Sequence, residues 1–293
     1  MLQPYKAKAK VYTILTFILR LFWQYYGYVV KYKDTYQTMR KRGGRAMEKF
    51  SLKCFLLIEI SFYSMIFLSD FLGLFPHLPI TMLKFCTVLT CLFFSIWYQL
   101  SSKSSSHYFI FITASLFFSL FADYFLIFTK FYFLGICMFL IVQICYCKII
   151  QKNVWNMLSF GVGGSFLFCL ICWLVSIDIN ITAALAAVYF FCLLFNLVNA
   201  WKGQMGLFAL GICLLLFCDI HVGIGNLTLY VELNRGGWLD SWYRIAPSMV
   251  WVFYIPGQVM VTLSGWMRMD GRLVRIGESE EPAAVHTSRE MDI

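Results

Sequence analysis

Long apolar runs separated by short polar breaks fill most of this chain. Eight runs are long enough to cross a hydrocarbon core of about 30 Å, which takes ~20 residues of helix. They cover approximately residues 52–74, 79–100, 107–128, 131–150, 155–176, 180–200, 204–222 and 246–266. The breaks carry turn-forming and charged residues, such as "PHLP" at 76–79 and "SSKSSSH" at 101–107. The pattern predicts an all-α integral membrane protein, a bundle of eight transmembrane helices.

The segments outside these runs predict three accessory features. Residues 11–30 are apolar but aromatic, with Arg20 near the middle, which favours a helix lying in the membrane interface. The longest connection, 223–245, is amphipathic and Gly-rich and suits an interfacial loop or lid. Beyond residue 268 the chain is charged, which predicts disorder. We therefore divide the chain into a basic amphipathic N-terminal arm (1–50), a transmembrane domain (51–268) and a disordered cytoplasmic tail (269–293).

Composition and charge exclude a soluble globular protein and suggest an orientation. Hydrophobic residues make up 60% of the chain and charged ones 13%, against about 45–50% and about 25% in soluble proteins. Of 24 Lys and Arg residues, 12 lie in residues 1–53. If the N-terminus is cytoplasmic, 20 of the 24 lie in cytoplasmic flanks, which predicts that both termini are cytoplasmic. We expect a bacterial cytoplasmic membrane, with the basic arm contacting anionic lipid headgroups rather than nucleic acid.

Few of the familiar catalytic or metal-binding patterns are present. The 11 cysteines lie almost entirely in apolar segments, where cysteine behaves as a small hydrophobe. Cys169 and Cys172 form a C-x-x-C pair without a second pair, and the four histidines are scattered without ligand spacing. There is no G-x-S-x-G, phosphate-binding or H-E-x-x-H motif. An enzyme built from this chain would have to use carboxylates as acid and base.

Two aspartates inside apolar runs are the strongest candidates for that role. Asp123 and Asp219 lie near the ends of the 107–128 and 204–222 segments. These segments cross the membrane in the same direction, so the two carboxylates are predicted to lie at similar depth. Acidic residues inside membrane segments are costly and mark sites of chemistry, transport or binding.

Other polar side chains are predicted to face the same region. They are Gln143, Tyr146, Tyr189, Asn196, Tyr254 and Gln258. Tyr254 and Gln258 are four residues apart and therefore share one helix face. A structural interpretation competes with the functional one, because amide and hydroxyl groups also form hydrogen bonds between membrane helices. Glu59, near the middle of the first apolar run, has no predicted role.

Four stretches together resemble the YhhN-like lysoplasmalogenases, a family of eight-helix membrane proteins. They are "FADYFLIFTKFYFLGICMFLIVQICY" (121–146), "AAVYFFCLLFNLVNAW" (186–201), "GLFALGICLLLFCDIHVGIGNL" (206–227) and "WVFYIPGQVMVTLSG" (251–265). They follow the order of the family's motifs over about 107–266 and include both aspartates. The chain departs from the family pattern at three positions: it has Gln143 in place of His, Cys218 in place of Ser and Asn196 in place of Met.

The resemblance implies hydrolysis of the vinyl ether bond of a lysoplasmalogen, which releases a fatty aldehyde and a glycerophospho-base. Such cleavage starts with proton delivery to carbon and continues with attack of water on an oxocarbenium ion. It requires one protonated acid and one carboxylate, as in glycoside hydrolysis. Repulsion between two nearby carboxylates in an apolar pocket favours keeping one of them protonated. Asp123 and Asp219 are the implied catalytic pair, the six polar residues above the substrate-binding set, and no metal or organic cofactor is required.

Two other functions fit the same pattern of residues. One is a lipid-binding or transport protein on the same scaffold without catalysis, which Gln143 and Cys218 favour because neither matches the family residue. The other is a proton-coupled carrier of small solutes, since paired intramembrane acids suit proton relays. The chain shows neither an inverted repeat nor a pair of broken helices of the kind such carriers contain.

Overall fold

The computed structural model describes residues 44–74, 77, 79–101, 107–231 and 236–279, and within these residues all regular structure is helical. Among the described residues, eight helices are long and apolar enough to cross a membrane, which confirms the predicted all-α class and helix number. They are α2 (Gly44–Leu72), α3 (Ile80–Ser101), α4 (His107–Phe128), α5 (Tyr132–Ile149), α6 (Val154–Leu174), α7 (Ile181–Lys202), α8 (Gly206–Gly225) and α9 (Trp238–Ser279), with a short 3₁₀ helix, η2 (Leu227–Leu229), between the last two. The orientation of the termini stays a prediction.

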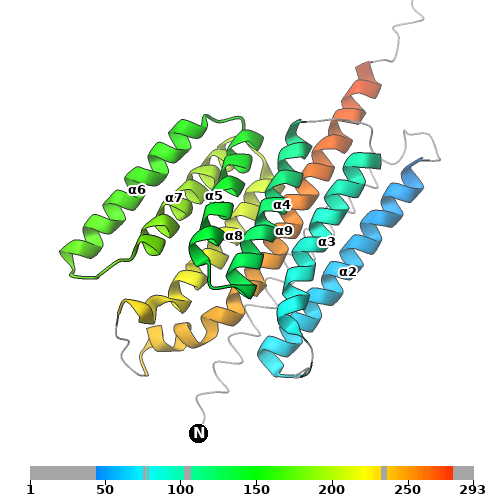
Figure 1. Ribbon diagram of the computed structural model, residues 1–293. Helices are drawn as coiled ribbons and strands as arrows, with labels where there is room; N and C mark the ends of the chain where they lie inside the picture. Colours follow the sequence, from blue (N-terminus) through cyan, green and yellow to red (C-terminus); the bar gives the residue numbers. More distant parts are fainter. Residues whose placement is uncertain (1–43, 75–76, 78, 102–106, 232–235, 280–293) are drawn as a thin grey trace, which may run out of the picture. The chain divides into compact units, whose positions relative to one another are not determined.

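Contacts divide the chain into two units, Met1–Leu52 and Lys53–Ile293. The second unit holds α3 to α9 and most of α2. In it, α6 and α7 lie on one side and α2 and α3 on the other, with α4, α5, α8 and α9 between them (Figure 1). The closest helix pairs are α8 with α9, α4 with α5, and α6 with α7. The two aspartates therefore lie on central helices.

The largest difference from the predicted segments concerns α9. It covers Trp238–Ser279 and includes Pro247 and Pro256, whereas the apolar run predicts only 246–266. Its first turns are polar and are held by Asp240, whose Oδ2 accepts from the backbone N–H of Gly236 (3.0 Å) and pairs with Arg244 (2.8 Å). The predicted interfacial loop 223–245 is therefore shorter, because α8 and α9 extend into it from both ends.

The predicted arm and tail are described only where they join the helices. Helix α2 already begins at Gly44. Helix α9 continues through Ser279, so residues 269–279, which we expected to be disordered, are helical. The remaining residues, 1–43 with the predicted interfacial helix and 280–293, lie outside the described part of the chain.

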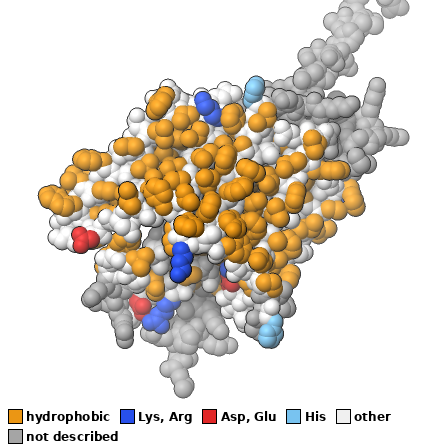
Figure 2. Space-filling view, viewed as in Figure 1, with side chains coloured by type: hydrophobic (Ala, Val, Ile, Leu, Met, Phe, Trp, Pro, Cys, Tyr) orange, Lys and Arg blue, Asp and Glu red, His pale blue; other side chains and the backbone are white. Residues whose placement is uncertain are grey.

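The outer surface of the second unit is apolar, as a lipid-facing surface requires. Large side chains project from the helices unburied, among them Phe93, Trp155, Phe166 and Trp173. Hydrophobic side chains cover most of the face seen in Figure 2, and only a few charged ones interrupt it. In water such a surface would be strongly unfavourable, so the bundle is built for a bilayer.

Short turns join the helices from α5 to α8. Three of them use a non-glycine residue in the left-handed region at the end of a helix: Gln151 (φ 60°), Ser176 (φ 59°) and Gln204 (φ 53°). The N-termini of α6 and α7 are capped by Asn153 and Asn180, whose side chains accept from backbone N–H groups at 2.9 and 2.8 Å. Caps of this kind satisfy donors that a helix start leaves unpaired, and they fix where consecutive helices reverse direction.

Two glycines allow α8 and α9 to approach closely. A Cβ on Gly211 would lie 3.0 Å from the backbone nitrogen of Val261, and one on Gly257 would lie 2.9 Å from Cδ2 of Leu215. Both distances are shorter than a normal carbon contact, so only glycine fits without a shift. Small residues at such crossings are typical of membrane helix packing. The crossing fixes α8, which carries Asp219, against the part of α9 that carries Tyr254.

Candidate active site

The first carboxylate of the site, Asp123, belongs to a polar stripe on α4. Ser115, Ser119 and Asp123 follow one another at intervals of four residues, and all three are buried in the bundle. Asp123 is only 4% exposed. Its Oδ2 accepts a hydrogen bond of 2.7 Å from the hydroxyl of Tyr254 on α9. A hydrogen bond to a carboxylate is among the stronger ones in proteins, so Tyr254 fixes the orientation of this acid.

The second carboxylate, Asp219, has the same kind of partner. The hydroxyl of Tyr189 on α7 donates to Oδ2 of Asp219 on α8 at 2.8 Å. The ring of Tyr189 lies 5.6 Å from the ring of Phe139 on α5. Asp219 is less enclosed than Asp123, being partly rather than fully buried.

Cys218 connects the two acid–tyrosine pairs. Its side chain is buried, it directly precedes Asp219 in α8, and its thiol lies within long-range electrostatic reach of Asp123. Tyr189 and Tyr254 are also within interaction range of this thiol. The two aspartates, the two tyrosines and Cys218 therefore form one cluster, which we call the carboxylate cluster, on α4, α7, α8 and α9.

Two of the predicted substrate-binding residues border the carboxylate cluster with polar atoms unpaired. Tyr146 is fully buried and interacts electrostatically with Asp219. Its hydroxyl has no hydrogen-bond partner among the described residues. Gln258 donates weakly to Oγ of Ser119 (3.5 Å), and its Oε1 is likewise unpaired among the described residues. Buried polar atoms are normally hydrogen-bonded, so these two groups are available to a polar ligand or water.

The other two predicted residues, Gln143 and Asn196, bind each other. The side-chain amide of Asn196 donates to the backbone oxygen of Gln143 at 2.9 Å and to its Oε1 at 3.0 Å. It also contacts the sulfur of Met157 at 3.4 Å. This pair joins α5 to α7 and matches the structural interpretation of intramembrane amides better than the functional one. We place it outside the carboxylate cluster, and its role in binding stays a prediction.

Glu59 forms a separate buried polar group between α2 and α3. Its Oε1 accepts from the hydroxyl of Thr90 and from the thiol of Cys91. Its Oε2 is buried without a partner among the described residues. Thr90 and Cys91 lie on α3, whereas the tyrosine partners of Asp123 and Asp219 lie on α9 and α7. We therefore do not count Glu59 as a third member of the carboxylate cluster.

Sequence reasoning missed Ser115 and Ser119. Serine is common in membrane helices, and neither residue stands out by type. The spacing could have identified them, because both fall on the helix face that carries Asp123. Among the described residues, no group of three or more His, Cys, Asp and Glu side chains could hold a metal ion. The chemical groups that the cluster does offer are two carboxyls, two phenols and a thiol.

Comparison with known proteins agrees with the motif order. The YhhN family matches the chain over residues 50–265, which includes every residue of the carboxylate cluster. Neither a curated protein nor a solved structure matches it. The family match covers well over half of the 293 residues. This chain belongs to the YhhN family.

Proposed function

We propose that this protein is a membrane hydrolase that cleaves the vinyl ether bond of lysoplasmalogens. The products are a fatty aldehyde and a glycerophospho-base. One observation carries the proposal: two carboxyl groups inside an apolar bundle are each held by a tyrosine from another helix. Paired carboxyls are the groups that acid-catalysed cleavage through an oxocarbenium ion needs. The substrate is a single-chain lipid, which suits a site reached from the bilayer.

The reaction divides into two proton-transfer stages. In the first, a protonated carboxyl gives its proton to the outer carbon of the C=C–O unit, which leaves an oxocarbenium ion. In the second, the other carboxylate removes a proton from water as its oxygen bonds to that ion. The resulting hemiacetal breaks into an aldehyde and a glycerol hydroxyl. The two stages together consume one water and no net protons.

Access to the two acids suggests which one performs which stage. Asp219 is partly exposed, whereas Asp123 is only 4% exposed, and we propose that the more open acid meets the attacking water. We therefore assign activation of water to Asp219 and proton delivery to Asp123. Tyr254 and Tyr189 orient the two carboxyls. The unpaired hydroxyl of Tyr146 and Oε1 of Gln258 position the substrate or the water.

We also propose a membrane and an orientation for the protein. The eight apolar helices of the described part of the chain make it a multi-pass membrane protein. The excess of Lys and Arg in one set of flanks supports cytoplasmic termini, and we propose the bacterial cytoplasmic membrane. Reporter domains fused to the two ends test the orientation: both should be active only on the cytoplasmic side.

A comparison of three lipids tests the chemistry of the bond. Purified protein in detergent is given 1-alkenyl, 1-alkyl and 1-acyl lysophosphoethanolamine of equal chain length. We expect aldehyde from the alkenyl lipid and no cleavage of the alkyl ether, which cannot form an oxocarbenium ion by protonation of carbon. Release of fatty acid from the acyl lipid at a higher rate than aldehyde from the alkenyl lipid would contradict the proposal.

A further inference from the structure

A partly buried ion pair lies between the end of α2 and the start of α3, outside the carboxylate cluster. Lys84 Nζ and Asp70 Oδ2 are 2.7 Å apart, and their side chains are only 15% and 18% exposed. Charges removed from water in this way gain little net stability, because desolvation offsets their attraction. Stabilisation of the fold is therefore a weak explanation for the ion pair, and binding of a ligand with matching charges is a better explanation.

Aromatic contacts lead from this ion pair directly to the carboxylate cluster. Lys84 Nζ lies over the ring of Trp251 on α9, 5.0 Å from its centroid. The ring of Trp251 meets the ring of Tyr254 edge-on at 5.5 Å, and Tyr254 donates to Asp123. Two aromatic side chains, Trp251 and Tyr254, thus link the ion pair to the first carboxylate.

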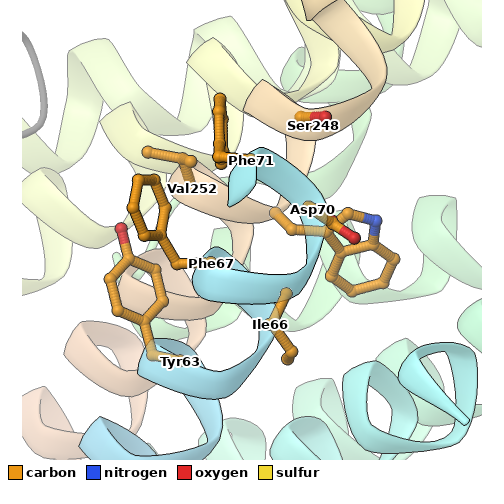
Figure 3. Close-up of a pocket in the computed structure, with 8 residues that line it drawn as sticks. Tyr63, Ile66, Phe67, Asp70, Phe71, Ser248 and Val252 are labelled. Atoms are coloured by element: carbon orange, nitrogen blue, oxygen red, sulfur yellow. The ribbon is translucent and has the colours of Figure 1, made fainter. Parts of the chain in front are cut away.

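A small hollow opens beside the ion pair between α2 and α9 (Figure 3). Asp70 and Tyr63 reach it from α2, and Ser248 and Trp251 from α9. The hydroxyl of Tyr63 is buried without a hydrogen-bond partner among the described residues. The hollow measures about 10 Å³, which is room for roughly one water molecule. The rest of its lining is apolar and consists of Ile66, Phe67, Phe71 and Val252.

We propose that Asp70, Lys84 and Trp251 bind the headgroup of a zwitterionic lysolipid, which carries one phosphate and one amine. Lys84 binds the phosphate, Asp70 binds the ammonium, and the face of Trp251 guides the chain towards Tyr254. The headgroup does not fit while Asp70 and Lys84 hold each other, so the pair opens and exchanges its internal contact for two contacts with the ligand. The inference rests on the proposed function, since it places the headgroup of the same substrate.

The arrangement fits the anatomy of the substrate. In a lysoplasmalogen the vinyl ether is separated from the phosphate by the glycerol unit. A headgroup held at Lys84 places the vinyl ether next to Trp251 and Tyr254. Asp123 lies there too, because it accepts a hydrogen bond from Tyr254. Lys84 and Asp70 lie near the ends of their membrane-spanning segments, at the level where lipid headgroups are found.

Substrates that differ only in the headgroup test the proposal. For Lys84→Met, we expect the KM for 1-alkenyl lysophosphoethanolamine to rise about tenfold, the effect of one charge-assisted hydrogen bond, with kcat within about twofold of wild type. The KM for 1-alkenylglycerol, which has no headgroup, should not change. Asp70→Asn should raise the KM for the ethanolamine lipid but not for the alkenyl lipid that ends in phosphate. Lys130→Met, which removes an exposed lysine at the same end of the bundle, is the matched control.

A charge-swapped variant separates binding from folding. Asp70→Lys combined with Lys84→Asp keeps an ion pair between the helices but exchanges its two ends. If the pair binds the headgroup, the swapped variant keeps the melting temperature of wild type, while its KM for 1-alkenyl lysophosphoethanolamine stays as high as in the single variants. Recovery of the KM in the swap would show that the pair only holds the helices together, and it would overturn the proposal.

A non-cleavable ligand keeps this proposal distinct from the proposed reaction. Binding of 1-alkyl lysophosphoethanolamine is measured by calorimetry in wild type, Lys84→Met and Lys130→Met. Weaker binding in Lys84→Met alone supports the headgroup site even if the wild type releases no aldehyde, an outcome that would refute only the reaction. Equal binding in all three variants, together with normal aldehyde release, would refute the headgroup site and leave the reaction intact.

Discussion

At the scale of single residues, each carboxyl depends on one phenolic hydroxyl. Tyr254 donates to Asp123 and Tyr189 donates to Asp219, each from a different helix. Replacing either tyrosine with phenylalanine removes the hydrogen bond and keeps the ring. We expect kcat/KM to fall about tenfold to a hundredfold in Tyr189→Phe, since hydrogen bonds to charged groups contribute about 1.5–3 kcal/mol. In Tyr254→Phe we expect a fall of about twofold to tenfold, because Asp123 is protonated and a neutral hydrogen bond contributes about 0.5–1.5 kcal/mol. The measurement is the initial rate of aldehyde release across substrate concentrations.

The control for these variants is Tyr132→Phe, which alters an exposed tyrosine at the start of α5. It should leave both kcat and KM unchanged. Equal rates in Tyr254→Phe, Tyr189→Phe and Tyr132→Phe would show that the hydroxyls do not act on the carboxyls during the reaction.

The sequence was sufficient to select the two aspartates but not to pair them. A charged residue in a 22-residue apolar helix is conspicuous by itself, because placing a charge inside a membrane costs free energy. Which tyrosine reaches which acid depends on how α4 meets α9 and how α7 meets α8, and spacing along the chain contains no information about that. The same limit explains why Gln143 and Asn196, which are similar in type to Gln258, bind each other instead.

At the scale of helices, the close crossing of α8 and α9 positions three of the five residues of the carboxylate cluster, Cys218, Asp219 and Tyr254. We expect Gly211→Ala and Gly257→Ala each to lower stability by about 1–3 kcal/mol, because the added Cβ overlaps the facing helix and overpacking has that cost. Thermal unfolding in detergent measures the change.

Gly223→Ala in the same α8 helix is the matched control for the crossing. No atom lies within 4 Å of the Cβ that this substitution adds. Alanine has the higher helix propensity, so the melting temperature should stay equal or rise slightly. If all three variants melt together with the wild type, the close approach is not what holds α8 and α9.

Helix positions were predictable from hydropathy, but helix ends were not. The apolar runs locate α3 to α8 closely, because about 20 apolar residues have few alternatives to a membrane helix. Polar turns at either end contribute nothing to that signal. For that reason the turns of α9 around Asp240 and Arg244 and its extension to Ser279 lie outside the predicted segment.

At the scale of the whole molecule, the apolar outer surface predicts where lipid touches the protein. Phe166, in the middle of α6, is 71% exposed, and Trp155, near its start, is 75% exposed. Lysine at the centre of a membrane helix costs about 2.5–3.5 kcal/mol, and near an end it extends to the interface. Phe166→Lys should therefore strongly reduce the amount of folded protein in the membrane fraction, whereas Trp155→Lys should be tolerated. Equal yields of the two variants would show that this face of α6 does not meet the lipid core.

The central claim is that Asp123 and Asp219 carry out acid–base cleavage of a vinyl ether. The most direct test is aldehyde release from 1-alkenyl lysophosphoethanolamine by the purified protein, compared with Asp123→Asn, Asp219→Asn and, as control, Asp178→Asn at an exposed aspartate. An amide cannot deliver or accept the proton, so we expect kcat to fall about 10²–10⁴-fold in the first two variants. The control should match wild type, and all four proteins should melt alike. Aldehyde release that persists in both intramembrane variants, or that is absent from a well-folded wild type, would contradict the account.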